Sequence, residues 1–137
     1  MSTRSLIGIQ INKKEVRYIY CHWDGYPDYN GRILNESYSK KYKIDDLIFK
    51  GDISALKKNI EDISYYDNDD NEKDISYKTI GLKDYFSDKY IFNSEYRYLY
   101  DLTNQWIVYD VYRNLKAPLI KVIENIDNNL DEFHNCE

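Results

Sequence analysis

The sequence has few cysteines, few glycines and no long hydrophobic run. Its 137 residues include two Cys, two Pro and five Gly. Cys21 and Cys136 lie at opposite ends of the chain, so they do not form the framework of a disulfide-stabilised domain, and we expect reduced thiols. No run of about 18 apolar residues occurs, which argues against a membrane partner. The N-terminus has no secretory hydrophobic region, so we expect a soluble, cytoplasmic protein.

The motifs of common enzyme classes are absent as well. The sequence has no GxGxxG, P-loop or GxSxG pattern, which removes the usual support for nucleotide or serine hydrolysis. The fragments Cys21-His22 and His134-Asn135-Cys136 match no zinc signature. The acidic run 67–72 lacks the central Gly and the Glu spacing of a calcium loop. We therefore expect no metal site and no cofactor.

Tyrosine is the residue in excess. The chain has 16 Tyr beside four Phe and two Trp. An AT-rich genome would account for part of this excess, but a Tyr ring also offers apolar area, a stacking face and a hydroxyl that tolerates water. The net charge of −5 and the isoelectric point of about 5.1 disfavour a nucleic-acid partner. The composition thus suits a folded protein that recognises something other than nucleic acid.

Four segments with strand character predict two hairpins. Apolar residues alternate over 5–11 and again over 16–23, with the loop 12–15 between them. The segments 95–102 and 106–112 are rich in Tyr, Val, Ile and Trp and flank a short polar turn. These hairpins predict an antiparallel sheet.

Helical spacing accounts for much of the rest. Short helices are expected over 31–38, before Gly51, and from Asp52 to about Ile60 or Ile63. An amphipathic C-terminal helix is expected from Pro118 to about Phe133. A short strand over 75–80 and a turn or helix over 81–90 complete the pattern. We predict one α+β domain spanning 1–137, with an acidic loop at 61–74 and a frayed end at 134–137.

The second hairpin raises the question of a binding face. Period two places Tyr96, Tyr98 and Tyr100 on one face of the sheet and Arg97 on the other. A sheet that carries Tyr and Arg can stack bases and bind phosphates. The alternative is that these tyrosines are half-buried sheet residues and that the arginine stems simply cover them.

The densest group of reactive residues is the segment VRYIYCHWDGYP, residues 16–27. Adjacent strand residues point to opposite faces, so Cys21 and His22 cannot pair as nucleophile and base. His22 and Asp24 share a face if the strand continues and are the candidate catalytic pair, but turn chemistry is the commoner explanation of both, so no catalytic residue is assigned. The candidate ligand- or partner-binding residues are Arg4, Arg17, Tyr20, His22, Trp23, Asp24, Tyr26, Arg97 and Tyr98.

Three stretches of the first sixty residues carry a resemblance. They are TRSLIGI at 3–9, YIYCHWDGYP at 18–27, and Leu47-Ile48 followed by Gly51-Asp52-Ile53-Ser54. Together they resemble a group of small uncharacterised proteins of bacteriophages and mobile elements. The resemblance implies a genomic setting, that of a small accessory phage protein acting in the host cytoplasm, and it implies no activity.

Two functions fit that setting. In the first, the chain is an anti-CRISPR-like inhibitor of a bacterial antiviral defence system, which binds a defence protein or sequesters a nucleotide second messenger. In the second, it is a small hydrolase or phosphodiesterase-like enzyme that uses His22 and Asp24. The Tyr-rich composition and the missing catalytic template favour the binding protein. Self-association into a homo-oligomer and a structural role in the virion stay open as weaker alternatives.

Overall fold

An open sheet of six strands forms the centre of the molecule, in a computed structural model that describes residues 3–65, 77–87 and 94–135. The strand order is β3-β2-β1-β4-β5-β6. The bounds are β1 Ser5–Gln10, β2 Glu15–Cys21, β3 Lys78–Gly81, β4 Tyr96–Tyr100, β5 Trp106–Asp110 and β6 Leu115–Pro118. The predicted α+β fold is confirmed.

Both predicted hairpins form, and they join through a parallel pair. β1 pairs antiparallel with β2, and β4 pairs antiparallel with β5, while β1 and β4 run parallel at the centre. The edge strands β3 and β6 extend the sheet on either side. Because β1 and β4 begin at the same end of the sheet, four segments meet there. They are the N-terminus, the loop after β2, the residues before β4 and the β5–β6 turn.

The helices are short. A π-helical turn, η1 (Pro27–Gly31), leads into α1 (Arg32–Ser37), and α2 (Lys41–Phe49) follows before Gly51. A 3₁₀ turn, η2 (Ile60–Asp62), comes next, and α3 (Leu82–Tyr85) and α4 (Leu119–Asp127) complete the set. Gly51 has φ 98°, a conformation that favours glycine, and this residue ends α2 as predicted.

Two helical predictions are wrong. The segment after Gly51 is not helical before the 3₁₀ turn η2, because Ile53 forms bridges to Cys21 and Tyr65 beside the sheet and Asp52 accepts a hydrogen bond from the Tyr20 amide. The C-terminal helix ends at Asp127 instead of continuing to Phe133. Asn129 has φ 60°, so the chain turns back and buries the Phe133 ring.

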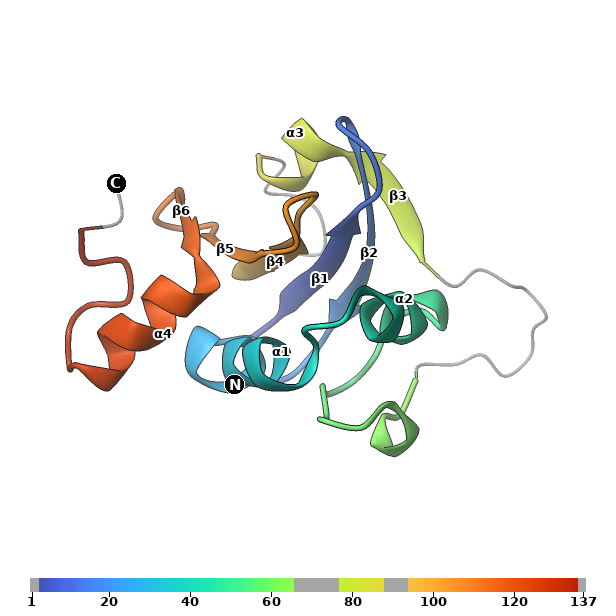
Figure 1. Cartoon of the computed structure of the whole chain (residues 1–137), viewed down its shortest axis with the longest axis horizontal. Coiled ribbons are helices and arrows are strands. Elements are labelled where there is room, and N and C mark those ends of the chain that lie inside the picture. Colours follow the sequence, from blue (N-terminus) through green and yellow to red (C-terminus); the bar gives the residue numbers. More distant parts are fainter. Residues whose placement is uncertain (1–2, 66–76, 88–93, 136–137) are drawn as a thin grey trace.

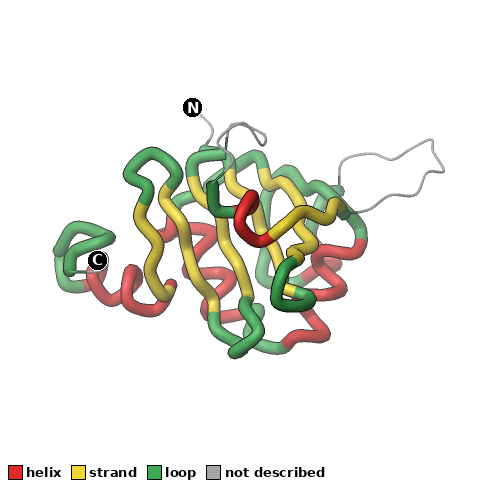
Figure 2. Tube along the Cα trace, turned by 90° about the horizontal axis from the view of Figure 1, so that it is seen from above, coloured by secondary structure: helices red, strands yellow, loops and turns green. Residues whose placement is uncertain are grey.

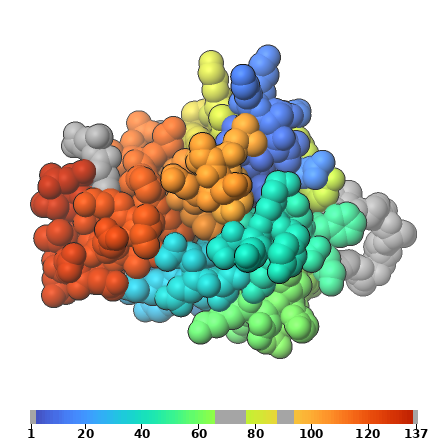
Figure 3. Space-filling model, in the orientation of Figure 1, coloured from blue at the N-terminus to red at the C-terminus, as the bar shows by residue number. Residues whose placement is uncertain are grey.

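The helices divide between the two faces of the sheet. α1, α2 and α4 cover one face, and α3 lies against the other (Figure 1, Figure 2). Figure 3 shows α4, α1 and α2 as a continuous layer. The main core lies beneath this layer, and a smaller cluster lies under α3, made of Leu6, Val16, Tyr18, Tyr85 and Leu99.

The second hairpin does not present its tyrosines as a binding face. Tyr96, Tyr98 and Tyr100 all point into the main core beneath the helices. Arg97, on the opposite face, is fully buried and donates hydrogen bonds to the Ser94 hydroxyl and the Tyr85 carbonyl. These tyrosines are therefore core residues, which is close to the alternative interpretation of the same pattern.

Several expectations concern the ends and loops of the chain. Most of the predicted acidic loop falls on residues 66–76, outside the described residues. In the predicted frayed end, His134 is described: its amide bonds to Asp131 and its carbonyl accepts from Asn125, whereas residues 136–137 lie outside the described part. Within the described ranges, no helix has both the length and the apolar character needed to span a bilayer.

Candidate functional site

The loop after β2 is tied closely to the end of the sheet. The Gly25 amide donates to the Thr3 carbonyl at 2.8 Å, and a Cβ atom added at Gly25 would lie 2.7 Å from that same oxygen. Only glycine allows this approach of the two backbones. From the core side, the Tyr98 hydroxyl donates to the Gly25 carbonyl at 2.6 Å. Tyr98, a predicted binding residue, therefore supports the loop from the core and does not reach the surface.

Trp23 is held by its backbone on two sides. Its amide donates to the Ser54 carbonyl at 2.9 Å, and its carbonyl accepts from the buried Asn30 side chain at 3.2 Å. The Asn30 amide closes the loop by donating to the Asp24 carbonyl at 3.1 Å. Asp24 itself has φ 59°, a left-handed conformation that Asp tolerates better than most residues. The Trp23 ring is thus presented from a fixed backbone.

Four aromatic side chains are exposed at this end of the sheet. Trp23 and Tyr26 are each 45% exposed, Tyr29 is 56% exposed and Tyr112 is 77% exposed. The Tyr26 ring lies 6.2 Å from that of Tyr29 and 6.0 Å from that of Tyr96, both centroid to centroid. We call the end of the sheet that carries Trp23, Tyr26, Tyr29 and Tyr112 the aromatic end. Large rings on a fixed backbone are typical of recognition surfaces.

A cavity of about 290 Å³ opens in the aromatic end. Three tyrosines, two carboxylates, one guanidinium and one threonine line it: Tyr26, Tyr96, Tyr112, Glu95, Asp110, Arg113 and Thr3. We call this cavity the tyrosine pocket. It draws its walls from all four segments that the parallel β1–β4 pair brings together.

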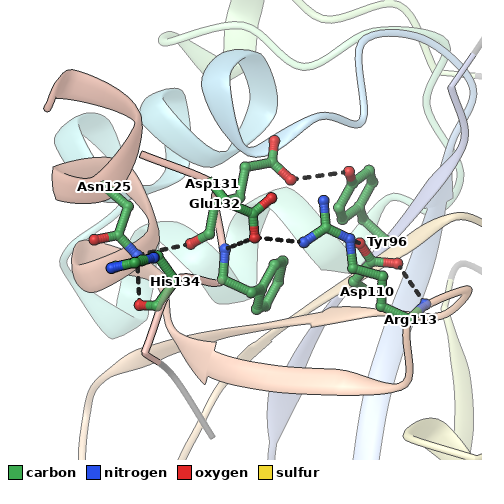
Figure 4. A network of polar contacts seen from close by, with 8 residues as sticks. Tyr96, Asp110, Arg113, Asn125, Asp131, Glu132 and His134 are labelled. Carbon is green, nitrogen blue, oxygen red and sulfur yellow. Dashed lines mark hydrogen bonds and ion pairs between the residues drawn. The ribbon is translucent and has the colours of Figure 1, made fainter. Parts of the chain in front are cut away.

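Arg113 connects the pocket to an acidic network (Figure 4). Its Nη1 donates to Asp131 at 2.8 Å, and its Nε lies 3.4 Å from Asp110. The Tyr96 hydroxyl donates to Glu132 at 3.3 Å. The hydrogen bond from Arg113 lowers the pKa of Asp131, whereas burial raises the pKa of Glu132. The single positive charge of Arg113 thus lies among three carboxylates, those of Asp110, Asp131 and Glu132.

The predicted catalytic pair does not form. The Tyr20 hydroxyl lies 2.8 Å from His22 Nδ1, and the His22 ring packs edge-on against Trp23 at 4.7 Å. No hydrogen bond joins His22 to Asp24, because the left-handed turn at Asp24 ends the strand on which the two would share a face. His22 and Asp24 therefore stand as separate polar side chains beside the aromatic end.

Cys21 and the acidic residues also fail to form a reactive centre. Burial raises the pKa of the Cys21 thiol to about 11, which keeps it protonated and unreactive. Across the described ranges, no group of three or more His, Cys, Asp or Glu side chains could hold a metal ion.

The structure brings together some of the predicted binding residues and separates others. His22, Trp23, Asp24 and Tyr26 lie at the aromatic end, together with the backbone of Arg4, which pairs with Glu95, and Tyr20 contacts His22. Arg17 lies elsewhere, with its guanidinium 5.0 Å above the Tyr77 ring in a cavity beside α2. Arg97 and Tyr98 are buried and present no surface to a ligand.

Four residues of the tyrosine pocket are not among the binding residues predicted from the sequence. Glu95 precedes β4, Asp110 is the last residue of β5, and Tyr112 and Arg113 belong to the turn that follows β5. Asn114, a residue type common in turns, is the local sequence signal that the chain reverses there, and in the structure it has φ 57°. Their proximity to Tyr26 depends on the parallel β1–β4 pair, which the sequence pattern does not reveal.

Comparisons with protein-family models, with curated proteins and with solved structures found no match. The geometry of the aromatic end is therefore the basis for a functional assignment. Its two main features, exposed rings on a fixed backbone and a pocket with an excess of carboxylates, are features of molecular recognition.

Proposed function

We propose that this chain is a binding protein that inhibits a bacterial antiviral defence system by engaging a defence protein through its aromatic end. The observation that carries the proposal is the exposure of Trp23, Tyr26, Tyr29 and Tyr112 on a closely hydrogen-bonded end of the sheet. Aromatic anchors supply much of the binding energy of protein interfaces, and a fixed backbone lowers the entropic cost of binding. The phage setting comes from the resemblance carried by YIYCHWDGYP.

The charge of the surface favours a protein partner over a nucleotide signal. Phosphate recognition needs arginine or lysine groups that are free to form bidentate contacts. Arg113, the guanidinium in the pocket wall, is already bonded to Asp131 and lies beside Asp110. The carboxylates around it would repel a phosphate. The hydrolase alternative has less support, because His22 and Asp24 do not pair.

The test measures protection of phage by the expressed chain. Bacterial strains that each carry one defence system are challenged with a phage sensitive to that system. We expect the chain to restore plaque formation against one system, and we expect Trp23→Ala to lose about tenfold or more of partner affinity, since removal of an anchor costs roughly 2 kcal/mol. Tyr42→Ala is the matched control, because Tyr42 is 70% exposed but lies on α2.

Three results would contradict the proposal. The first is that no defence system is inhibited by the parent chain. The second is that Trp23→Ala inhibits as well as Tyr42→Ala does while both remain folded. The third is a catalytic effect, in which substoichiometric amounts of the chain convert a nucleotide signal into a new product.

A further inference from the structure

We propose that the tyrosine pocket receives the cationic side chain of an arginine or lysine from a basic segment of the partner protein. This inference rests on the proposed function and specifies the chemistry of the partner. It is argued from the size of the pocket, from its aromatic walls and from the charges around it.

The pocket is large enough to admit a long side chain. Its volume of about 290 Å³ falls at the lower limit of sites for drug-sized ligands, which span roughly 300–1,000 Å³. The walls come from loops and strand ends and leave the pocket open to solvent, so a side chain that projects from a partner surface can enter. A partner residue with a long stem and a polar head would bury the stem against the rings.

The walls suit a cation. Tyr26 and Tyr96 have ring centroids 6.0 Å apart, and the Tyr112 ring is 77% exposed at the rim. The negative face of an aromatic ring attracts an ammonium or guanidinium group that lies over it. The Tyr96 hydroxyl is bonded to Glu132, which fixes the orientation of that ring. The pocket therefore offers aromatic surface without needing to rearrange.

The charges point the same way. Glu95 uses Oε1 to accept the Arg4 amide at 2.8 Å, and this neutral donor leaves the carboxylate charge in place. Arg113 provides one positive charge to Asp110 and Asp131 together. A cationic side chain in the pocket would lie near the Glu95 carboxylate. Its charge would add to that of Arg113 in neutralising the carboxylates around the pocket. The net charge of −5 on the whole chain would steer a basic segment toward the surface.

The experiment titrates the isotope-labelled chain with N-acetylarginine methylamide and follows the tyrosine ring resonances by NMR. N-acetylcitrulline methylamide is the neutral isostere. We expect saturable shifts of the Tyr26, Tyr96 and Tyr112 rings with the arginine probe, and binding of the citrulline probe weaker by about tenfold. Equal binding of the two probes, or shifts spread over rings outside the pocket, would overturn the inference.

Two variants with matched controls locate the site. Glu95→Gln keeps an oxygen for the Arg4 amide and removes the charge, so it should weaken arginine binding by about fivefold or more. Glu124→Gln on α4 makes the same charge change at an exposed position away from the pocket and should leave binding unchanged. Tyr112→Ala should weaken binding by about two- to fivefold, and Tyr42→Ala should not. Equal effects of Glu95→Gln and Glu124→Gln would refute a pocket site.

The same variants separate this inference from the proposed function. If Trp23→Ala abolishes phage protection while Glu95→Gln and Tyr112→Ala protect as the parent does, the cation site is refuted and the proposed function stands. If the arginine probe binds as expected but Trp23→Ala and Tyr112→Ala still protect fully, the proposed use of the aromatic end is refuted. Preferential binding of inorganic phosphate at the pocket would overturn the assigned charge preference.

Discussion

Replacement of Tyr98 by Phe tests the link between the core and the aromatic end. Tyr98 is fully buried, and its hydroxyl donates to the carbonyl of the buried Gly25 at 2.6 Å. The change removes one oxygen atom and keeps the ring in place. It leaves the Gly25 carbonyl without its donor at a position that water does not reach.

The magnitude follows from that burial. A typical hydrogen bond contributes about 0.5–1.5 kcal/mol net, but a buried acceptor left without a donor costs about 1–3 kcal/mol. We therefore expect Tyr98→Phe to lower the free energy of unfolding by about 2 kcal/mol in urea denaturation, and to lower Tm by roughly 5–10 °C. Hydrogen exchange of the Gly25 amide, which bonds to Thr3, should accelerate because the loop loses its support.

Tyr100→Phe is the control on the same strand and the same face. The Tyr100 hydroxyl donates to the carbonyl of Ser39 at 3.1 Å, and Ser39 is exposed, so water can replace the lost donor. We expect this variant to lose less than about 1 kcal/mol. The reasoning is refuted if Tyr98→Phe costs no more than Tyr100→Phe, or if the Gly25 amide exchanges at the parent rate.

Three further predictions concern the same region. Gly25→Ala should cost about 1–3 kcal/mol in denaturation, since its Cβ would meet the Thr3 carbonyl, and an unchanged midpoint would contradict this. Because burial raises the pKa of Cys21 to about 11, iodoacetamide near pH ~8 should modify this thiol only after unfolding, as peptide mass spectrometry would detect. Burial also raises the pKa of Glu132, so the folded state binds that proton more tightly than the unfolded state does, and stability falls as pH rises through the raised pKa. Glu132→Gln should flatten this slope in pH-dependent melts, and an unchanged slope would refute it.

The sequence predicts the local elements because they depend on local patterns. Alternation over 5–11 and around Tyr98 gives strands, and the polar loops between neighbouring strands give hairpins. The parallel contact between β1 and β4 pairs Ser5 with Tyr96, 91 positions apart in the chain, and no local pattern encodes it. The aromatic end could be foreseen in its first half, around Trp23 and Tyr26. Its second half, around Glu95 and Tyr112, depends on that long-range pair.

The sequence pattern also does not predict whether the β4 tyrosines lie on a buried or an exposed face of the sheet. Period two shows that Tyr96, Tyr98 and Tyr100 share a face, but it does not say whether helices cover that face. Tyrosine is ambiguous here because its ring suits a core and its hydroxyl suits a surface. The same limit applies to Arg97, whose burial depends on the Ser94 hydroxyl and the Tyr85 carbonyl.

The tyrosine excess has two structural roles that lie side by side. In the interior, tyrosine hydroxyls bind backbone carbonyls of separate segments: Tyr98 binds that of Gly25, Tyr38 that of Lys57 and Tyr85 that of Tyr98. The bond to Gly25 satisfies a buried carbonyl that a phenylalanine at position 98 would leave without this donor. At the aromatic end, the exposed Tyr26 ring follows Gly25, whose carbonyl the Tyr98 hydroxyl binds. If the proposed function is correct, the interior tyrosines prepare the surface that the exposed ones use, so a conservative Tyr→Phe change in the core would reduce binding without touching the partner.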